Sequence, residues 1–184
     1  MVNYQVFELI NGEAGRFDWL DDVMEAAATW LIYVAFAITA TLVVLALYRR
    51  RVRPVLELGV TLAVAFVAAT AVAHLSAQVR PFQTHQVHQL IPHEPGLSLP
   101  SDHATAAFAL AFGVGLFLHR RWGLLLLLAA LVVGVSRIWV GVHYPGDIAV
   151  AVAIAGLAAA EVGLWSRWRA GPATANAAGR PDVL

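Results

Sequence analysis

The sequence predicts an all-α fold, a polytopic membrane bundle of about five transmembrane helices. Sixty per cent of its 184 residues are hydrophobic and its mean hydropathy is +0.70, which is too apolar for a soluble domain of this length. Five apolar stretches are long enough, or nearly so, to cross a hydrocarbon layer about 30 Å thick. These stretches run near residues 26–47, 55–77, 102–118, 122–139 and 148–166.

The two ends of the chain are predicted to differ from these spans. The first 24 residues are acidic and hold a single Arg, so they do not resemble a cleaved signal peptide. They form either a disordered tail or a short interfacial helix that ends near Asn11. One face of that helix would consist of four apolar residues, Val6, Phe7, Leu9 and Ile10. Residues 1–169 are expected to form a single membrane-embedded domain, and residues 170–184 a disordered cytoplasmic tail.

Arginine placement predicts the orientation of the spans. All twelve basic residues are Arg, and most of them lie in three places, at 49–53, 120–121 and 167–169. The positive-inside rule assigns these ends to the cytoplasm. Arg80, Arg137 and the N-terminus then lie on the other side. We therefore expect a multi-pass protein of the bacterial cytoplasmic (inner) membrane, with residues 78–101 and 136–147 facing outward.

The segment SRIWVGVHYPGD, from Ser136 to Asp147, carries the strongest chemical signal. Asp147 lies four residues after His143 and can accept a hydrogen bond from one ring nitrogen. The other nitrogen then stays unprotonated, as a nucleophile or base requires. Arg137 adds a guanidinium that can hold phosphate. Taken alone, such a pair is more often a helix-capping Asp and a surface His. The interpretation of His143 as a nucleophile or base therefore depends on the neighbouring motifs.

Two further segments are predicted on the same side of the membrane. At residues 100–103 the sequence reads PSDH, and Ser101 suits the N-cap of the following span. The amides of that helix start can bind an anion and His103 can deliver a proton there, although simple capping is the alternative. We expect the carboxylate of Asp102 to turn away and to pair with an Arg or with backbone donors. Arg80 either binds an anion or anchors its span at the interface.

Other ionisable residues are weaker candidates. His74 lies inside the second predicted span and can face a pocket at its outer end. The loop after that span holds several potential metal ligands, His85, His88, His93 and Glu94. His85 and His88 are three residues apart, but the sequence offers no carboxylate partner at ligand spacing except Glu94, so no metal is expected. No other cofactor and no nucleic-acid partner is predicted.

Together these segments resemble the signatures of the type-2 phosphatidic acid phosphatase superfamily. The third signature is complete, with its Ser, Arg, His and Asp at Ser136, Arg137, His143 and Asp147. The second is present with Asp102 in place of Gly. Arg80 and Pro81 match the first, but Ala73 occupies the position of its Lys. Within the superfamily, the PSDH segment and the His-rich loop are similar to those of bacitracin-resistance-type undecaprenyl-diphosphate phosphatases.

The resemblance implies a role for each matching residue. His143 would attack the terminal phosphorus to form a phosphohistidine, with Asp147 holding its tautomer. His103 would protonate the leaving oxygen and then activate water. The phosphoryl oxygens would be bound by Arg80, Ser101 and Arg137, and further candidates for the pocket are Asp102, His74 and Ser136.

The expected function is hydrolysis of undecaprenyl diphosphate to undecaprenyl phosphate, without a metal, at the outer face of the membrane. This reaction serves peptidoglycan biosynthesis and confers bacitracin resistance, and the partners would be the lipid diphosphate and the surrounding membrane lipids. A phosphatase for phosphatidic acid or phosphatidylglycerol phosphate is an alternative with the same site. A transporter or channel subunit, with Arg80, His74 and Glu161 along a polar path, is an alternative of another class. An inactive scaffold is a further alternative, because Ala73 replaces the Lys.

Overall fold

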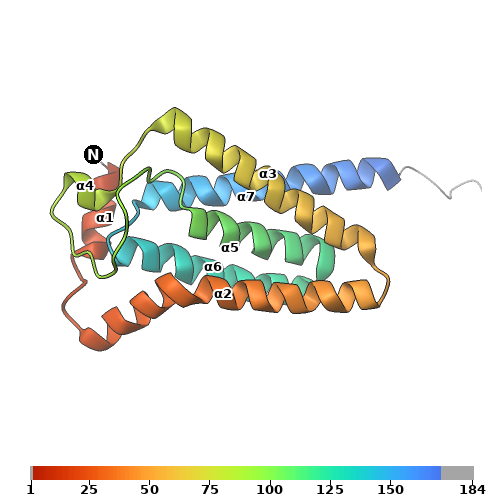
Figure 1. Ribbon diagram of the computed structural model, residues 1–184, viewed down its shortest axis with the longest axis horizontal. Coiled ribbons are helices and arrows are strands. Elements are labelled where there is room, and N and C mark those ends of the chain that lie inside the picture. Colours follow the sequence, from red (N-terminus) through yellow and green to blue (C-terminus); the bar gives the residue numbers. More distant parts are fainter. Residues whose placement is uncertain (1, 171–184) are drawn as a thin grey trace, which may run out of the picture.

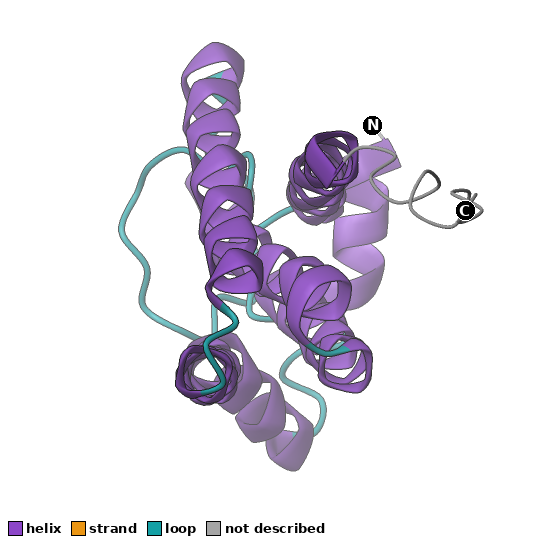
Figure 2. Ribbon diagram, turned by 90° about the vertical axis from the view of Figure 1, so that its right-hand side faces the viewer, coloured by secondary structure: helices purple, strands orange, loops and turns teal. Residues whose placement is uncertain are grey.

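The computed structural model describes residues 2–170, which form an elongated bundle of roughly parallel and antiparallel helices (Figure 1). The elements in chain order are α1 (Val2–Asn11), α2 (Asp18–Tyr48), α3 (Val52–Ser76), α4 (Pro81–Thr84), α5 (Asp102–Gly113), the π-helical turn η1 (Val114–Leu118), α6 (Arg120–Trp139) and α7 (Pro145–Ala170). Loops join the helices, and no strand appears in the described part of the chain (Figure 2). The predicted all-α fold class is confirmed.

Four helices, α2, α3, α6 and α7, are long and apolar enough to cross a membrane, and α5 with η1 adds a shorter apolar helix. Their positions agree with the five predicted spans, although α2, α3, α6 and α7 all begin before their apolar stretches. The first, α2, starts at Asp18, since its polar first turns lie beyond the apolar region. The last, α7, starts at Pro145, because proline suits the first helical position. Pro145 and Gly146 therefore belong to the first turn of α7.

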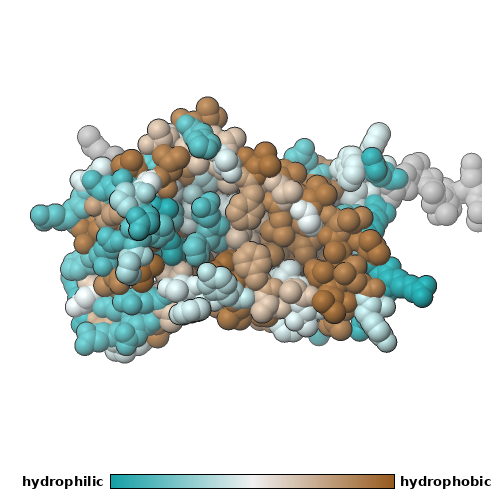
Figure 3. Space-filling model, in the orientation of Figure 1, coloured by the Kyte–Doolittle hydropathy of each residue, from teal (hydrophilic) through white to brown (hydrophobic). Residues whose placement is uncertain are grey.

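The surface of the bundle is apolar between two polar ends (Figure 3). Large apolar side chains on several helices are exposed, including those of Val67, Leu128 and Leu157. A soluble monomer rarely exposes so much contiguous apolar surface. This surface therefore suits contact with lipid, and the molecule is a multi-pass membrane protein.

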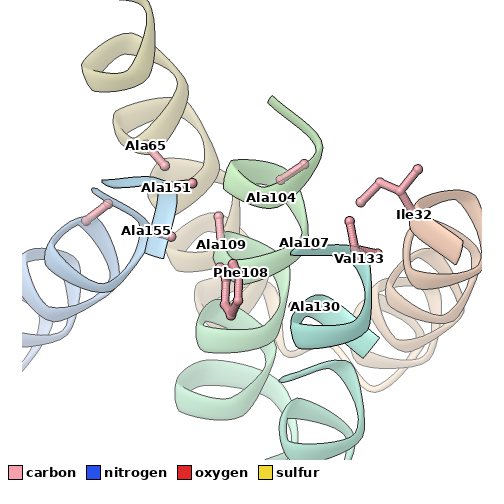
Figure 4. Packing of buried hydrophobic residues seen from close by; sticks show 12 residues of the cluster. Ile32, Ala65, Ala104, Ala107, Phe108, Ala109, Ala130, Val133, Ala151 and Ala155 are labelled. Atoms are coloured by element: carbon pink, nitrogen blue, oxygen red, sulfur yellow. The ribbon is translucent and has the colours of Figure 1, made fainter. Parts of the chain in front are cut away.

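Helix α5 lies at the centre of the bundle and packs against α3, α6 and α7 (Figure 4). Most of its residues are buried, and the side chains that surround it are mainly alanines. Small residues let helix backbones approach closely, which is the usual way that membrane helices pack. Phe108 fills the space that the alanines leave in this cluster. The start of α5, with the PSDH segment, is therefore held rigidly by its neighbours.

The alternating direction of the helices places the three sequence motifs at one end (Figure 1). Helices α3 and α6 run toward this end, while α5 and α7 begin there. The loop 77–101, the start of α5 and the 140–144 turn are thus neighbours. The arginine-rich segments, 49–51, 120–121 and 167–169, lie at the opposite end, as the charge pattern predicts.

The N-terminal segment forms the predicted helix, α1, and ends at Asn11. Its environment differs from the expectation, because Phe7 is only 1% exposed and its ring meets that of Tyr144 edge to face at 5.5 Å. Asn11 donates to the carbonyl oxygens of His88 and Trp139, at 2.8 and 2.7 Å. Val6 and Leu9 are exposed instead of sharing the buried face with Phe7. Helix α1 therefore packs over the loop that holds His143, and the disordered alternative is wrong for residues 2–11. The expected disordered tail lies, after Ala170, outside the described residues.

Candidate active site

His143 and Asp147 form the centre of the candidate site. His143 lies in the turn between α6 and α7, and Asp147 lies in the first turn of α7. Nδ1 of His143 is 3.2 Å from Oδ2 of Asp147, and both side chains are buried. The backbone N–H of Tyr144 donates to the same carboxylate oxygen at 2.8 Å. A carboxylate in this position favours the tautomer with hydrogen on Nδ1, which leaves the lone pair of Nε2 free to react.

Two residues that sequence analysis missed complete the environment of Asp147. The Gln78 side-chain amide donates to Oδ1 of Asp147 at 2.9 Å, and the Ser98 hydroxyl donates to Oδ2. The segments that carry them are tied together, because the Ser98 N–H donates to the Gln78 carbonyl at 2.7 Å. An isolated antiparallel bridge between Val79 and Leu97 adds to this link. Only one feature of the sequence marks these two residues: each is a polar residue two positions before a motif. Gln78 precedes the RP motif, and Ser98 precedes the PSDH motif.

Arg80 reaches the reactive side of the imidazole. Its Nη1 lies 3.1 Å from Nε2 of His143 and donates to the Val142 carbonyl at 3.3 Å. Because Nδ1 of His143 faces Asp147, Nε2 is the acceptor of this contact. Burial lowers the pKa of Arg80, while the charges of Asp102 and Asp147 act in the opposite direction. Arg80 therefore occupies the place where an anion would meet Nε2.

Arg137 supplies unsatisfied donors at the same end. It lies in the last turn of α6, its residue is 2% exposed, and its Nη1 donates to the Ala28 carbonyl at 3.2 Å. Its Nε and Nη2 are buried and have no hydrogen-bond partner among the described residues. A buried cation with unpaired donors is costly unless a ligand satisfies it. A phosphate group, which accepts through several oxygens, is the kind of ligand that these donors suit.

The PSDH segment opens α5 as predicted. Ser101 is the N-cap, and its hydroxyl oxygen accepts from the Ala104 N–H at 3.4 Å. His103 is partly buried in the first turn and lies within electrostatic range of Arg80, Arg137 and His143. The expectation for Asp102 is partly wrong, because its side chain is exposed and forms no ion pair in the described structure. Because Asp102 lies at the surface of the helix, water hydrates its carboxylate and no protein hydrogen-bond donor is required.

Two other sequence candidates do not join the site. His74 is exposed near the end of α3 and makes no hydrogen bond within residues 2–170, so its expected place in the pocket is not supported. Ser136 is buried, but its hydroxyl donates to the Val133 carbonyl at 2.8 Å. A serine that bonds to the preceding helical turn points along its own helix. Ser136 therefore stabilises α6 locally and does not face a phosphate.

The three histidines of the loop have separate roles. The ring centroid of His93 lies 6.5 Å from that of His143, a neighbour that the sequence did not predict. Burial lowers the pKa of His93, and the charge of Arg80 lowers it further. His85 packs on Tyr4 at 4.1 Å, while His88 bonds through its backbone to Asn11. No group of three potential metal ligands gathers in the part of the chain that the structure describes.

The protonation state of His143 suits nucleophilic attack. Burial lowers its pKa to about 4, its hydrogen bond to Asp147 opposes the shift, and the charge of Arg137 adds to it. Near neutral pH the imidazole is therefore uncharged and Nε2 has a lone pair. Because His143 is uncharged, the positive charges of Arg80 and Arg137 remain available to an anionic ligand. The arrangement defines a multi-pass membrane protein with a histidine-based site for phosphoryl groups.

Comparison with known proteins specifies the family. Residues 54–170 match the PAP2 superfamily, and the chain belongs to that superfamily as a membrane phosphatase. The chain is 36% identical to the undecaprenyl-diphosphatase BcrC of Bacillus subtilis (strain 168) over 147 residues, which cover 80% of this chain and 75% of the relative. It is 34% identical to the bacitracin transport permease protein BcrC of Bacillus licheniformis, over 90% of this chain and 80% of that one.

A solved structure supports the same family. The crystal structure of Aquifex aeolicus LpxE aligns with a TM-score of 0.73 and 25% identity, over 88% of this chain and 94% of that chain. The similarity extends over the whole bundle and is not limited to the motifs.

Proposed function

We propose that this membrane phosphatase converts undecaprenyl diphosphate to undecaprenyl phosphate through a phosphohistidine at His143. The observation that carries the proposal is the set of buried, unpaired donors on Arg137, whose charge acts on His143 together with that of Arg80. This set suits a terminal phosphoryl group. The choice of lipid rests on the undecaprenyl-diphosphatase of Bacillus subtilis, to which most of the chain is similar.

In the first step, Nε2 of His143 attacks the terminal phosphorus and the bond to the bridging oxygen breaks. The Nε2–P bond forms, undecaprenyl phosphate leaves, and Nδ1–H stays bonded to Asp147, which stabilises the imidazolium. Arg80 exchanges its contact with Nε2 for one with a phosphoryl oxygen. Arg137 donates through Nε and Nη2, so both guanidiniums act on the charge of the transition state.

His103 serves both steps as a proton carrier. His103 takes up a proton as the anionic diphosphate binds beside it, because a nearby negative charge favours the charged imidazole. It donates this proton to the bridging oxygen as the lipid phosphate leaves, and the neutral imidazole then takes a proton from water. The water oxygen attacks the phosphorus, the Nε2–P bond breaks, and inorganic phosphate is released. His143 returns to its neutral form with hydrogen on Nδ1. No step of this cycle uses a metal ion.

The proposal includes an active enzyme in spite of Ala73 at the position of the family's Lys. Ala73 is partly buried in the last turns of α3, and Arg80 follows it by seven residues. Arg80 and Arg137 already place two positive charges at the site. We therefore infer that the missing Lys lowers phosphate affinity without removing the reaction, which argues against an inactive scaffold.

The catalytic end is proposed to face the outside of the inner membrane, because the opposite end carries the arginine-rich turns. The chain has no cysteine, so single cysteines report orientation without background. Gln86→Cys in the catalytic-end loop should react with a membrane-impermeant maleimide in intact cells. Arg121→Cys should react only after the membrane is opened. The reverse pattern would contradict the orientation.

Purified protein in detergent tests the reaction. Phosphate release from undecaprenyl diphosphate should persist in a chelator, and a base-stable, acid-labile phosphoryl group should be trapped on the wild type but not on His143→Ala. Faster turnover of phosphatidic acid or phosphatidylglycerol phosphate would instead support the alternative lipid. Wild-type protein that binds these lipids without releasing phosphate would refute the phosphatase proposal and favour a transport role.

A further inference from the structure

An apolar groove with a volume of about 680 Å³ lies at the arginine-rich end of the bundle. Its walls come from the end of α5 with η1, the start of α6 and the last turns of α7. None of the residues of the candidate active site lines it. Along α6, the Arg120 end of the groove lies roughly 26 Å from Arg137 of the candidate active site, at 1.5 Å per residue.

Small residues create this groove. A Cβ atom on Gly123 would lie 2.2 Å from the Cα of Gly115, so η1 and α6 are in backbone contact there. On α7, Gly156, Ala160 and Gly163 face the groove with little or no side chain. Both α6 and α7 pack on α5, and the small residues of α7 leave the space between them unfilled. The groove is therefore a consequence of residue choice along one stripe of α7.

Two arginines give the groove a charged end. Arg120 and Arg167 both line it, both are exposed, and neither has a hydrogen bond or an ion pair among residues 2–170. Nearby Arg53 differs, because it pairs with Glu57 at 2.9 Å and donates to the Ser166 carbonyl. Arg120 and Arg167 are thus free to bind an anion at the end of an apolar channel.

We propose that the groove binds an anionic phospholipid from the leaflet on the arginine-rich side. The lipid phosphate lies between Arg120 and Arg167, and an acyl chain follows the groove toward Gly156. From Gly156 to Arg167 the helix rises by roughly 16 Å, close to half of a hydrocarbon layer about 30 Å thick. The groove therefore has the length of one leaflet, with positive charge at the headgroup level and apolar walls below.

A second copy of the chain fits this surface less well. A symmetric contact through the groove would bring two copies of Arg120 and Arg167 together, and their like charges would repel without counterions. Exposed Leu116, Leu124 and Leu164 line the groove and open it sideways to the bilayer. A lipid can enter by this side, and its bound phosphate lies too far from His143 to be hydrolysed.

Lipid titration of the full-length protein in detergent, followed by native mass spectrometry, tests the site. Phosphatidylglycerol should bind more tightly than phosphatidylcholine with the same chains. The double variant R120Q/R167Q should bind phosphatidylglycerol about 30-fold more weakly, as expected for two surface arginines. Ala160→Phe should weaken the binding of both lipids, because the phenyl ring fills the groove.

Two control variants distinguish lipid binding in the groove from lipid binding elsewhere on the surface. Arg121→Gln removes a neighbouring charge that does not line the groove, and Ala153→Phe adds an exposed ring to α7 outside it. Both should bind phosphatidylglycerol like the wild type, which also shows that such variants fold. Equal loss in Arg121→Gln, no loss in the double variant, or a dimer disrupted by Ala160→Phe would each overturn the proposal. Lipid binding is measured without turnover, so the outcome is independent of the proposed phosphatase reaction.

Discussion

The arginines at the two ends of the bundle differ in their surroundings. Arg137 is buried at the catalytic end and keeps unpaired N–H groups, while Arg120 and Arg167 at the other end are exposed. A buried guanidinium gains much from an anion, because water does not satisfy it. An exposed one already bonds to water, so exchanging this water for phosphate gains only about 1 kcal/mol. This difference in burial is the reason that we propose transition-state stabilisation for Arg137 and weaker lipid binding for Arg120 and Arg167.

The largest effect should come from Asp147→Asn at the catalytic end. An amide at this position bonds to the wrong tautomer of His143, so kcat for phosphate release should fall about 10,000-fold. The variant should keep its helical circular dichroism spectrum in detergent. A decrease of less than tenfold would show that Asp147 does not orient the imidazole.

Arg137→Gln tests the comparison of the two ends directly. Loss of a buried donor pair should lower kcat/KM about 100- to 1,000-fold. Arg121→Gln, which removes an exposed arginine at the opposite end, should leave kcat/KM within about twofold. Similar losses in both variants would show that overall charge, and not burial at the site, controls the reaction.

A smaller effect is expected for Gln78→Ala. Gln78 acts through Asp147 and not on the substrate, so kcat should fall about tenfold while KM stays unchanged. Gln86→Ala, in the same loop but exposed, is the matched control. A change confined to KM would mean that Gln78 contacts the lipid and is not a positioning residue.

The smallest effect concerns stability and pH. The pKa of His143 is about 4 in the folded protein and about 6.5 when unfolded, so the unfolded chain binds more protons between these values. Acidification from pH 6.5 to 4 should therefore lower the melting temperature of the wild type more than that of His143→Gln. If the melting temperatures of the two proteins fell equally with pH, His143 would not be buried in its neutral form.

Much of the catalytic end could be predicted because its central contact is local. His143 lies in the turn just before α7 and Asp147 lies in the first turn of that helix, so the four-residue spacing itself brings them together. The number of predicted spans between two motifs also determines whether they lie at the same end of the bundle. Gln78 and His93 could not be predicted, because they reach the site through loops whose paths depend on contacts with distant segments.

The sequence by itself determined the membrane class, the helix order and the common end of the motifs, because apolar length, charge placement and short spacing are properties of the chain. Only the tertiary structure decided which donors stay unpaired, which histidine faces His143 and where a groove opens. Arg137 shows the reason: its sequence signal predicts a phosphate ligand, but the isolation of Nε and Nη2 results from the packing of α2 and α6 around it. The burial of a side chain and the pairing of its hydrogen-bond donors depend on atoms from several helices, so a single segment of sequence does not determine them.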